Sequence, residues 1–479
     1  MTDLVSVTAD DTRAASAAFF AERANRVAQH AVTSQGIRNV ARVPEAAARN
    51  TTTFDVEVKQ GNRTDQMRSG RCWMFAALNT MRCRVMKKYG VKTFELSQAY
   101  PLFWDKLEKA NWFFENIIDT VDDPLEGRLV AFLLTDPVGD GGQWDMFKAL
   151  VKKYGVVPKE AMPETACSKN TREMDGYLTR YLRACAKRLR DAAAEGASAD
   201  DLRALKKTFM ENVYALLVIC LGEPPARFDV RLRGKGGDVD KAAKKAAADA
   251  AADASADAAD DEDEDDEKLV LAGTFTPLEF FAEAVDMDID NYVSLVSAPT
   301  ADKPYGRTYT VARLGNVVEA GGVRYLNLEP AGLKAAAIRQ LKADLPVWFG
   351  CDVDQSFIQN EGLMDLDSLD VDALFGFDVE AGFDKAARLD YGESCMTHAM
   401  VLEGVNFGEN GEPTLWKVEN SWGKDHAKNG FCSIADSWFD EYVYQVVVHK
   451  DYLEPADREA FETIEPIELA PWDPLGALA

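Results

Sequence analysis

Residues 66–76 read QMRSGRCWMFA, and this stretch decides what the rest of the chain can be. Ser69-Gly70 is a turn of small residues, and an apolar stripe with helical spacing follows it at Met74, Leu78, Met81 and Val85. Gly90 then offers a helix stop. A thiol at a helix start lies beside unpaired N–H groups and the positive end of the helix dipole, which lower its pKa. The stretch therefore predicts a helix that begins at Cys72, with Cys72 as a nucleophile.

A cysteine nucleophile needs a base, and the base needs a partner that orients it. His398 lies in the apolar segment 396–402, MTHAMVL, where a strand would hold its ring in a fixed place. Asn420 lies in 418–423, VENSWG, just after another predicted strand. The Asn420 side-chain oxygen can accept from one ring nitrogen of His398 and turn the other toward sulfur. Trp422 would shield that hydrogen bond from water.

An acyl-transfer site also needs donors for the oxyanion that forms during attack. Gln66, six residues before Cys72, is placed to offer its side-chain amide beside the backbone N–H of Cys72. Trp73 follows the nucleophile directly and is expected to support it by packing.

These residues also allow other interpretations. Cys72 alone is equally consistent with a buried helix cysteine. His426 is a rival base, but its charged surroundings favour a solvated side chain. Cys395 and His398 have metal-ligand spacing, but no second ligand pair of the C-x-x-C or H-E-x-x-H kind accompanies them, so no metal site is predicted. No cofactor is predicted either.

Taken in order, Gln, Cys-Trp, His and Asn-Ser-Trp-Gly resemble the papain-like cysteine peptidases. The local papain pattern Cys-Gly-Ser/Ala-Cys-Trp is not met, because Ser69 stands where its first cysteine would be. A disulfide is therefore impossible there, which suits a reducing compartment. Within the papain-like group the chain looks like the bleomycin hydrolase and aminopeptidase C family, on four stretches: 69–76 SGRCWMFA, 390–394 DYGES, 396–400 MTHAM and 471–479 PWDPLGALA.

This resemblance implies an α+β fold, in which a papain-like core of a helical half and a β-barrel half carries helical insertions and a C-terminal arm. It implies a cytoplasmic cysteine aminopeptidase that acts on peptides with a free N-terminus and assembles as a homohexamer around an internal channel. It also implies that the last residue, Ala479, binds the substrate N-terminus and limits cleavage to that end of the peptide.

The order of the elements agrees with two halves, because helical patterns come first and strand patterns later. We expect five parts: an N-terminal segment 1–65, a helical half 66–155, a helical insertion 156–300, a β half 301–455 and an arm 456–479. The strands are predicted at Thr308–Arg313, Val323–Leu328, Pro346–Phe349, Ala399–Val405, Leu415–Val418 and Tyr442–Val448. Residues 235–268 are alanine-rich and then acidic, with eight consecutive acids over 260–267, and they predict a disordered surface loop. Order is expected to resume at the capping box that begins at Thr276.

Composition narrows the function classes. The chain of 479 residues has 80 acidic and 54 basic residues and a formal charge of −26, which argues against a nucleic-acid or anionic-membrane binder. No apolar run approaches the roughly 20 residues that span a bilayer. Eight cysteines are too sparse for a disulfide framework.

The sequence thus predicts peptide hydrolysis through a thioester on Cys72. Three alternatives stay open: an amidase acting on non-peptide aminoacyl amides, a nucleic-acid-binding scaffold, and an inactive peptidase that serves as an interaction protein.

Overall fold

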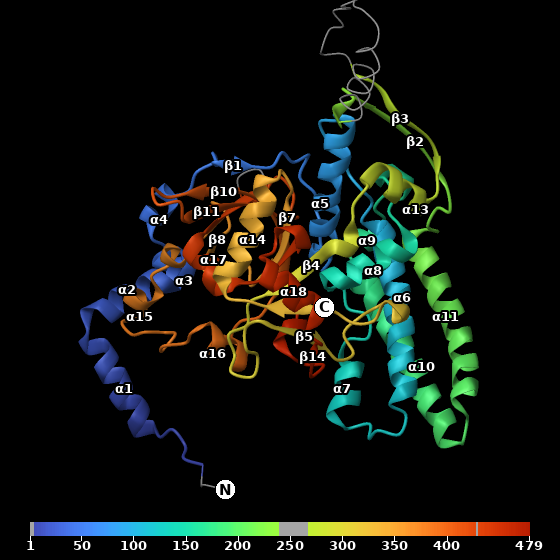
Figure 1. Cartoon of the computed structure of the whole chain (residues 1–479). Coiled ribbons are helices and arrows are strands. Elements are labelled where there is room, and N and C mark those ends of the chain that lie inside the picture. The colour runs from blue at the N-terminus through green and yellow to red at the C-terminus, as the bar shows by residue number, and fades with distance from the viewer. Residues whose placement is uncertain (1–3, 239–266, 428–429) are drawn as a thin grey trace, which may run out of the picture.

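The computed structural model describes residues 4–238, 267–427 and 430–479. Helices gather on one side of the molecule and strands on the other, with α5 (Cys72–Tyr89) between them (Figure 1). The predicted α+β architecture is confirmed. The acidic residues 239–266 lie outside the described residues, so the expectation of a disordered loop stays a prediction there.

Helix α5 begins at Cys72 and ends at Tyr89, as the sequence predicts. Gly90 closes it with a φ of 64°, a left-handed conformation that glycine adopts without strain. The sequence predicts one apolar stripe, but side chains all around the helix are buried, including Arg82. A helix that is buried on every face belongs to the core, and α5 packs against both a strand of the sheet and a neighbouring helix.

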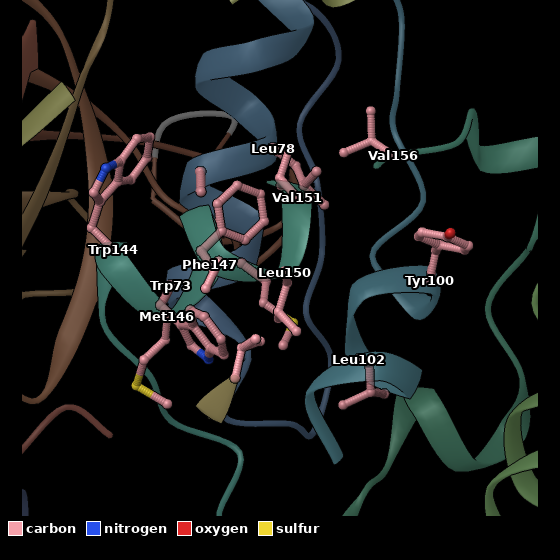
Figure 2. Close-up of a cluster of buried hydrophobic side chains, with 14 of the residues drawn as sticks. Trp73, Leu78, Tyr100, Leu102, Trp144, Met146, Phe147, Leu150, Val151 and Val156 are labelled. Carbon is pink, nitrogen blue, oxygen red and sulfur yellow. The ribbon is translucent and has the colours of Figure 1, made fainter. Parts of the chain in front are cut away.

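The other helices of the helical side lie on one side of α5 (Figure 1). They are α6 (Ala99–Asp119), α7 (Arg128–Thr135), α8 (Trp144–Tyr154), α9 (Ala166–Lys169), α10 (Arg172–Ala194), α11 (Ala199–Leu221) and α13 (Pro277–Phe280). Helix α8 packs directly against α5. Figure 2 shows the apolar cluster where Trp73 of α5 meets Phe147 of α8, whose rings pack edge to face with centroids 6.4 Å apart. The residue after the predicted nucleophile is therefore fixed in the core.

The strands form one mixed sheet with a hairpin beside it. The sheet order is β14-β5-β6-β4-β13-β7-β10-β11-β12-β9-β8, and β1 pairs with β10. Its strands are β1 (Val56–Glu57), β4 (Tyr292–Val296), β5 (Arg307–Val311), β6 (Tyr325–Asn327), β7 (Val347–Cys351), β8 (Phe357–Ile358), β9 (Leu363–Met364), β10 (His398–Phe407), β11 (Pro413–Glu419), β12 (Phe431–Ala435), β13 (Val443–His449) and β14 (Ile467–Leu469). Short helices border it: α14 (Pro330–Lys342), α15 (Val371–Phe375), α16 (Lys385–Asp390), α17 (Asp436–Tyr442) and α18 (Pro455–Thr463). All six predicted strands are present, while β4, β12 and the short strands β1, β8, β9 and β14 have no counterpart among them.

A correction concerns the end of the acidic segment. Regular structure is already present before Thr276, because β3 (Lys268–Phe275) pairs antiparallel with β2 (Phe228–Gly234) in a hairpin. The capping box at Thr276 is present, but it follows a strand. Pairing between segments about 40 residues apart has no local signal, which is why the sequence does not predict it.

The N-terminal helices lie apart from the core. Helices α1 (Ala9–Ala21) and α2 (Arg23–Gln35) have no buried residue, and α1 projects away from the body of the molecule (Figure 1). The short helices α3 (Ile37–Ala41) and α4 (Pro44–Ala48) bring the chain back to the sheet side, where Val43 donates to the Ser368 carbonyl. Of the helices in the described ranges, none combines the length and apolar character that crossing a membrane requires.

Candidate active site

Cys72 occupies the first position of α5, and its side chain is 4% exposed. Arg71 before it is the N-cap and leaves the helical conformation, so the backbone N–H groups of the first turn remain unpaired around the sulfur. The thiol also lies within hydrogen-bond reach of the backbone N–H of Ala399. Since Ala399 follows His398 directly, the thiol meets the start of β10.

His398 is the first residue of β10, and strand pairing fixes its position. Its backbone is in register with Cys351 of β7. The ring nitrogen Nε2 lies 2.9 Å from Oδ1 of Asn420, which follows β11. The Trp422 ring packs on the imidazole with centroids 5.0 Å apart. The structure therefore brings together the three residues that the sequence grouped around the base.

Gln66 lies beside the turn at Ser69-Gly70 that precedes Cys72. Both ends of its side-chain amide form hydrogen bonds. Its Nε2 donates to the Ser69 carbonyl over 2.6 Å, and its Oε1 accepts from the Ser421 hydroxyl over 2.6 Å. An amide NH₂ carries two N–H groups, so this side chain has one donor beyond the bond to Ser69. Because Ser421 follows Asn420, Gln66 also connects the nucleophile side to the base side.

The electrostatics of the pair differ from the sequence-based expectation. Burial raises the pKa of the Cys72 thiol to about 11, although N–H groups at the helix start act in the opposite direction. Burial also lowers the pKa of the His398 imidazole to about 4, although the hydrogen bond to Asn420 acts to raise it. The helix start predicts a lowered thiol pKa, and that expectation is wrong for the free enzyme because desolvation outweighs the helix dipole. Both shifts favour an uncharged Cys72 thiol and an uncharged His398 imidazole at neutral pH.

The C-terminal end of the chain lies against the loop that precedes α8. A Cβ added to Gly141 would come within 2.1 Å of the Leu478 carbonyl oxygen and 3.1 Å of the Ala479 carbonyl carbon. The adjacent Gly142 meets the Trp73 ring in the same way. Ala479 is thus placed next to the residues that surround Cys72.

Several contacts hold the arm in place. Lys303 pairs with Asp473 over 3.0 Å, and the Arg128 guanidinium stacks on Trp472 at 3.8 Å. Leu475 is buried. The chain end is therefore held by an ion pair at Asp473 and an aromatic contact at Trp472, and the residues after them reach the loop that precedes α8.

Two rival interpretations find no support. His426 is exposed, with its ring 6.1 Å from Trp422, and it lies outside the Asn420 hydrogen bond. Within the described ranges, no three His, Cys, Asp or Glu side chains are grouped as metal ligands would be.

The sequence does not predict the polar residues that support the turn at Ser69-Gly70, directly before Arg71 and Cys72. Fully buried Arg71 forms a two-pronged ion pair with Glu164, with both N···O distances 3.0 Å. Asp140 accepts from the Gly70 N–H over 2.8 Å and pairs with buried Lys106 over 2.8 Å. In the sequence, residues 136–142 are recognisable only as a turn, and nothing in their local pattern indicates a partner 70 residues away.

Comparisons with known proteins agree with this geometry. Residues 6–251 and 260–476 match the sequence profile of the Peptidase C1-like family. The chain is 42% identical to aminopeptidase C of Streptococcus thermophilus over 99% of its own length and 100% of that protein. It is 44% identical to aminopeptidase C of Listeria monocytogenes, over 95% and 94% of the two chains, and 40% identical to bleomycin hydrolase of Gallus gallus, over 87% and 86%. The crystal structure of PepW from Lactobacillus rhamnosis superposes with a TM-score of 0.89 at 43% identity and covers 99% of both chains.

Proposed function

The chain belongs to the Peptidase C1-like family, and from that premise we propose that Cys72, His398 and Asn420 are its catalytic residues. The observation that carries this proposal is the contact set at the start of β10. His398 bonds to Asn420 there, and the next backbone N–H reaches the Cys72 thiol. The papain-like fold and the cysteine aminopeptidase activity follow from the full-length similarity to the aminopeptidase C proteins.

The proposed reaction starts from the neutral pair. His398 takes the Cys72 proton as the sulfur attacks the substrate carbonyl, and the imidazolium then gives that proton to the leaving amine. The Cys72 N–H and the free N–H of Gln66 stabilise the oxyanion. Water, deprotonated by His398, then hydrolyses the thioester. Forming two buried charges costs free energy, and the attraction between the new thiolate and imidazolium offsets this cost.

Asn420 has a positioning role in this proposal. Its oxygen accepts from Nε2, which leaves Nδ1 as the ring nitrogen that takes the Cys72 proton in this proposal. Trp422 covers the hydrogen bond and keeps it dry. Trp73 holds the first turn of α5 in the core through Phe147 and through its indole N–H, which donates to the Asp140 carbonyl over 2.7 Å.

Ala479 is proposed to bind the free amine of the substrate through its carboxylate. Its support is the contact of the chain end with Gly141 and the docked base of the arm. Deleting 475–479 should lower turnover of substrates with a free N-terminus and raise turnover of N-blocked peptides. An unchanged ratio of the two rates in a folded variant rejects this role.

The experiment for the function as a whole compares matched fluorogenic substrates. We expect aminoacyl substrates with a free α-amine to be cleaved and their N-acetylated forms to be cleaved far more slowly. Cys72→Ala should abolish both reactions, with Cys83→Ala as the control because Cys83 is buried on the same helix. Residual turnover in Cys72→Ala equal to that of the control rejects Cys72 as the nucleophile.

The amidase and scaffold alternatives are not favoured, since the bacterial relatives named aminopeptidase C are the more similar ones. We further propose the finer features that the family resemblance implies: five parts with the boundaries given above, a cytoplasmic location and a homohexamer. The free state of the eight cysteines supports a reducing compartment. The exposed Phe19 and Phe20 on the unburied helix α1 support contacts between copies, which a native mass measurement tests.

A further inference from the structure

The loop 136–142 is fixed to α6 through its main chain. Lys106 donates to the Val138 carbonyl over 2.7 Å, and Lys109 donates to the Gly139 and Gly141 carbonyls over 2.7 Å and 2.5 Å. These lysines are 0% and 7% exposed. A buried ammonium requires partners, so the two lysines hold the carbonyls of the loop in place.

Asp140 extends from this fixed loop to both sides of Cys72. Its Oδ2 accepts from the Gly70 N–H over 2.8 Å and from the Thr171 hydroxyl over 2.5 Å. Its backbone carbonyl accepts from the Trp73 indole N–H over 2.7 Å. One residue therefore contacts the chain two positions before the nucleophile and one position after it.

The turn that Asp140 contacts needs support. Met67 has a φ of 55°, in the left-handed region that a side chain rarely adopts. Gly70 approaches Asp140 so closely that an added Cβ would lie 2.8 Å from the Asp140 Cβ. A strained, closely packed turn persists only where its surroundings hold it. Ser69 cannot supply a disulfide, so polar contacts hold the turn.

The charge of Asp140 is balanced within the same cluster. Burial is the main cause of the raised pKa of the Cys72 thiol, and the Asp140 carboxylate raises it further, so an unbalanced charge would disfavour thiolate formation. Lys106 pairs with Asp140 over 2.8 Å and with Asp175 over 2.9 Å. Despite burial, Lys106 keeps the pKa of Asp140 below its usual value, whereas burial raises the pKa of Asp175 to about 7. Asp140 is thus the ionised partner of the lysine at neutral pH.

We propose that Asp140 is a positioning residue for the reaction: by holding the Gly70 N–H and the Trp73 indole, it aims the Cys72 thiol and N–H at the substrate carbonyl. This inference rests on the proposed role of Cys72. It assigns Asp140 no contact with the substrate, so its effect falls on the chemical step and on the reactivity of the thiol.

The test compares Asp140→Ala, Asp140→Asn and Asp175→Asn by kcat, KM and the rate of Cys72 alkylation with iodoacetamide. Asp175→Asn is the matched control, because it changes the same Lys106 cluster without touching the turn. A misplacement of about 1 Å lowers a rate by about 100-fold, so Asp140→Ala should lose about 10- to 100-fold in kcat and in alkylation rate. Its KM should stay within about threefold, since substrate binding is left intact.

The conservative variant provides a rescue. The hydrogen bonds from Gly70 and Thr171 need an acceptor oxygen but no charge. In Asp140→Asn the amide oxygen can still accept both, but the amide NH₂ then replaces Oδ1 against Lys106, so kcat should recover only in part, to a value between those of Asp140→Ala and the wild type. In Asp175→Asn, kcat and the alkylation rate should stay within about twofold of the wild-type values, because Asp175 does not contact the turn before Cys72. Equal losses in Asp175→Asn and Asp140→Ala overturn the proposal, and so does a wild-type rate in Asp140→Ala.

If Asp140→Ala does not fold, Gly70→Ala replaces it. Its Cβ would displace the turn against Asp140 in an exposed position, so the alkylation rate should fall about tenfold or more by the same misplacement argument. An unchanged alkylation rate in a folded Gly70→Ala enzyme contradicts the proposal. Continued turnover by Cys72→Ala would instead reject the proposed function, whatever the Asp140 variants do.

Discussion

The nucleophile side and the base side of the proposed site are held by different chemistry. Cys72 follows a turn that is fixed by an ion pair and by hydrogen bonds: Arg71 donates to Glu164, and the Gly70 N–H donates to Asp140. His398 opens a strand that is paired on both sides within the sheet. A single polar substitution can therefore displace the backbone before the nucleophile, whereas the backbone of the base moves only if the sheet does.

The largest effect is expected at the base itself. His398→Ala removes the proton acceptor, and turnover should fall at least about 1,000-fold, as for the loss of a residue that acts as a unit with its nucleophile. The melting temperature should change little, which thermal unfolding checks. Turnover within tenfold of the wild type would show that another group takes the proton.

A smaller loss is expected for the residue that orients the base. Asn420→Ala leaves His398 in the sheet but frees its ring, so kcat should fall about 100-fold, at the low end of a general acid–base contribution. Initial-rate kinetics on one free-N-terminal substrate measure it. A loss as large as that of His398→Ala would mean that Asn420 does more than orient the ring.

The third change tests the ion pair on the nucleophile side. Glu164→Gln leaves the charge of fully buried Arg71 uncompensated, so the free energy of unfolding should drop by about 3 kcal/mol. Turnover per folded molecule should also fall several-fold, because Arg71 directly precedes Cys72. Chemical denaturation and active-site titration separate the two effects. Lost stability with unchanged turnover would make the pair structural only.

The same pair gives a pH dependence with a definite sign. Although burial opposes it, Arg71 holds the pKa of Glu164 below its usual value. A carboxyl with a lowered folded pKa contributes stability that is present at neutral pH and lost as the pH falls through that pKa. The stability gap between wild type and Glu164→Gln should therefore narrow below about pH 4, near the ordinary glutamate pKa. A gap that is constant down to about pH 3 contradicts the assignment.

The smallest effect on activity is expected from a core deletion on the base side. Val401 is fully buried in β10, and Val401→Ala should lower the free energy of unfolding by about 2 kcal/mol. Turnover per folded molecule should remain within about twofold, since pairing with β7 along residues 398–402 keeps the position of His398. A large loss of turnover in the folded variant would contradict the difference between the two sides.

Much of this site is predictable from sequence because its signals are local. The helix start at Cys72, the strand that begins at His398 and the segment around Asn420 each carry a short pattern of their own. Most strands of five or more residues follow in the same way, apart from β2, β3, β4 and β12, whereas the missed strands β1, β8, β9 and β14 have only two or three residues and are too short to show a period.

The supporting contacts have no such signal. Lys106 and Asp175 resemble ordinary surface charges within helices, yet they meet in the interior beside Asp140. The direction in which the pKa of the Cys72 thiol shifts is not predictable from the sequence either. A helix start is visible in sequence, but the burial that outweighs it depends on residues far along the chain, at β10.

The pH profile of Cys72 alkylation in the native enzyme decides whether Cys72 and His398 act as a pair. The thiol pKa is about 11 and the imidazole pKa about 4, so between these values the pair shares one proton. Proton transfer within the pair does not depend on pH, so we expect a constant rate from about pH 5 to about pH 8 and a fall near pH 4. His398→Ala should instead show a rate that rises about tenfold per pH unit over that range, because only the thiolate reacts. A wild-type profile with that same slope would contradict a Cys72–His398 pair.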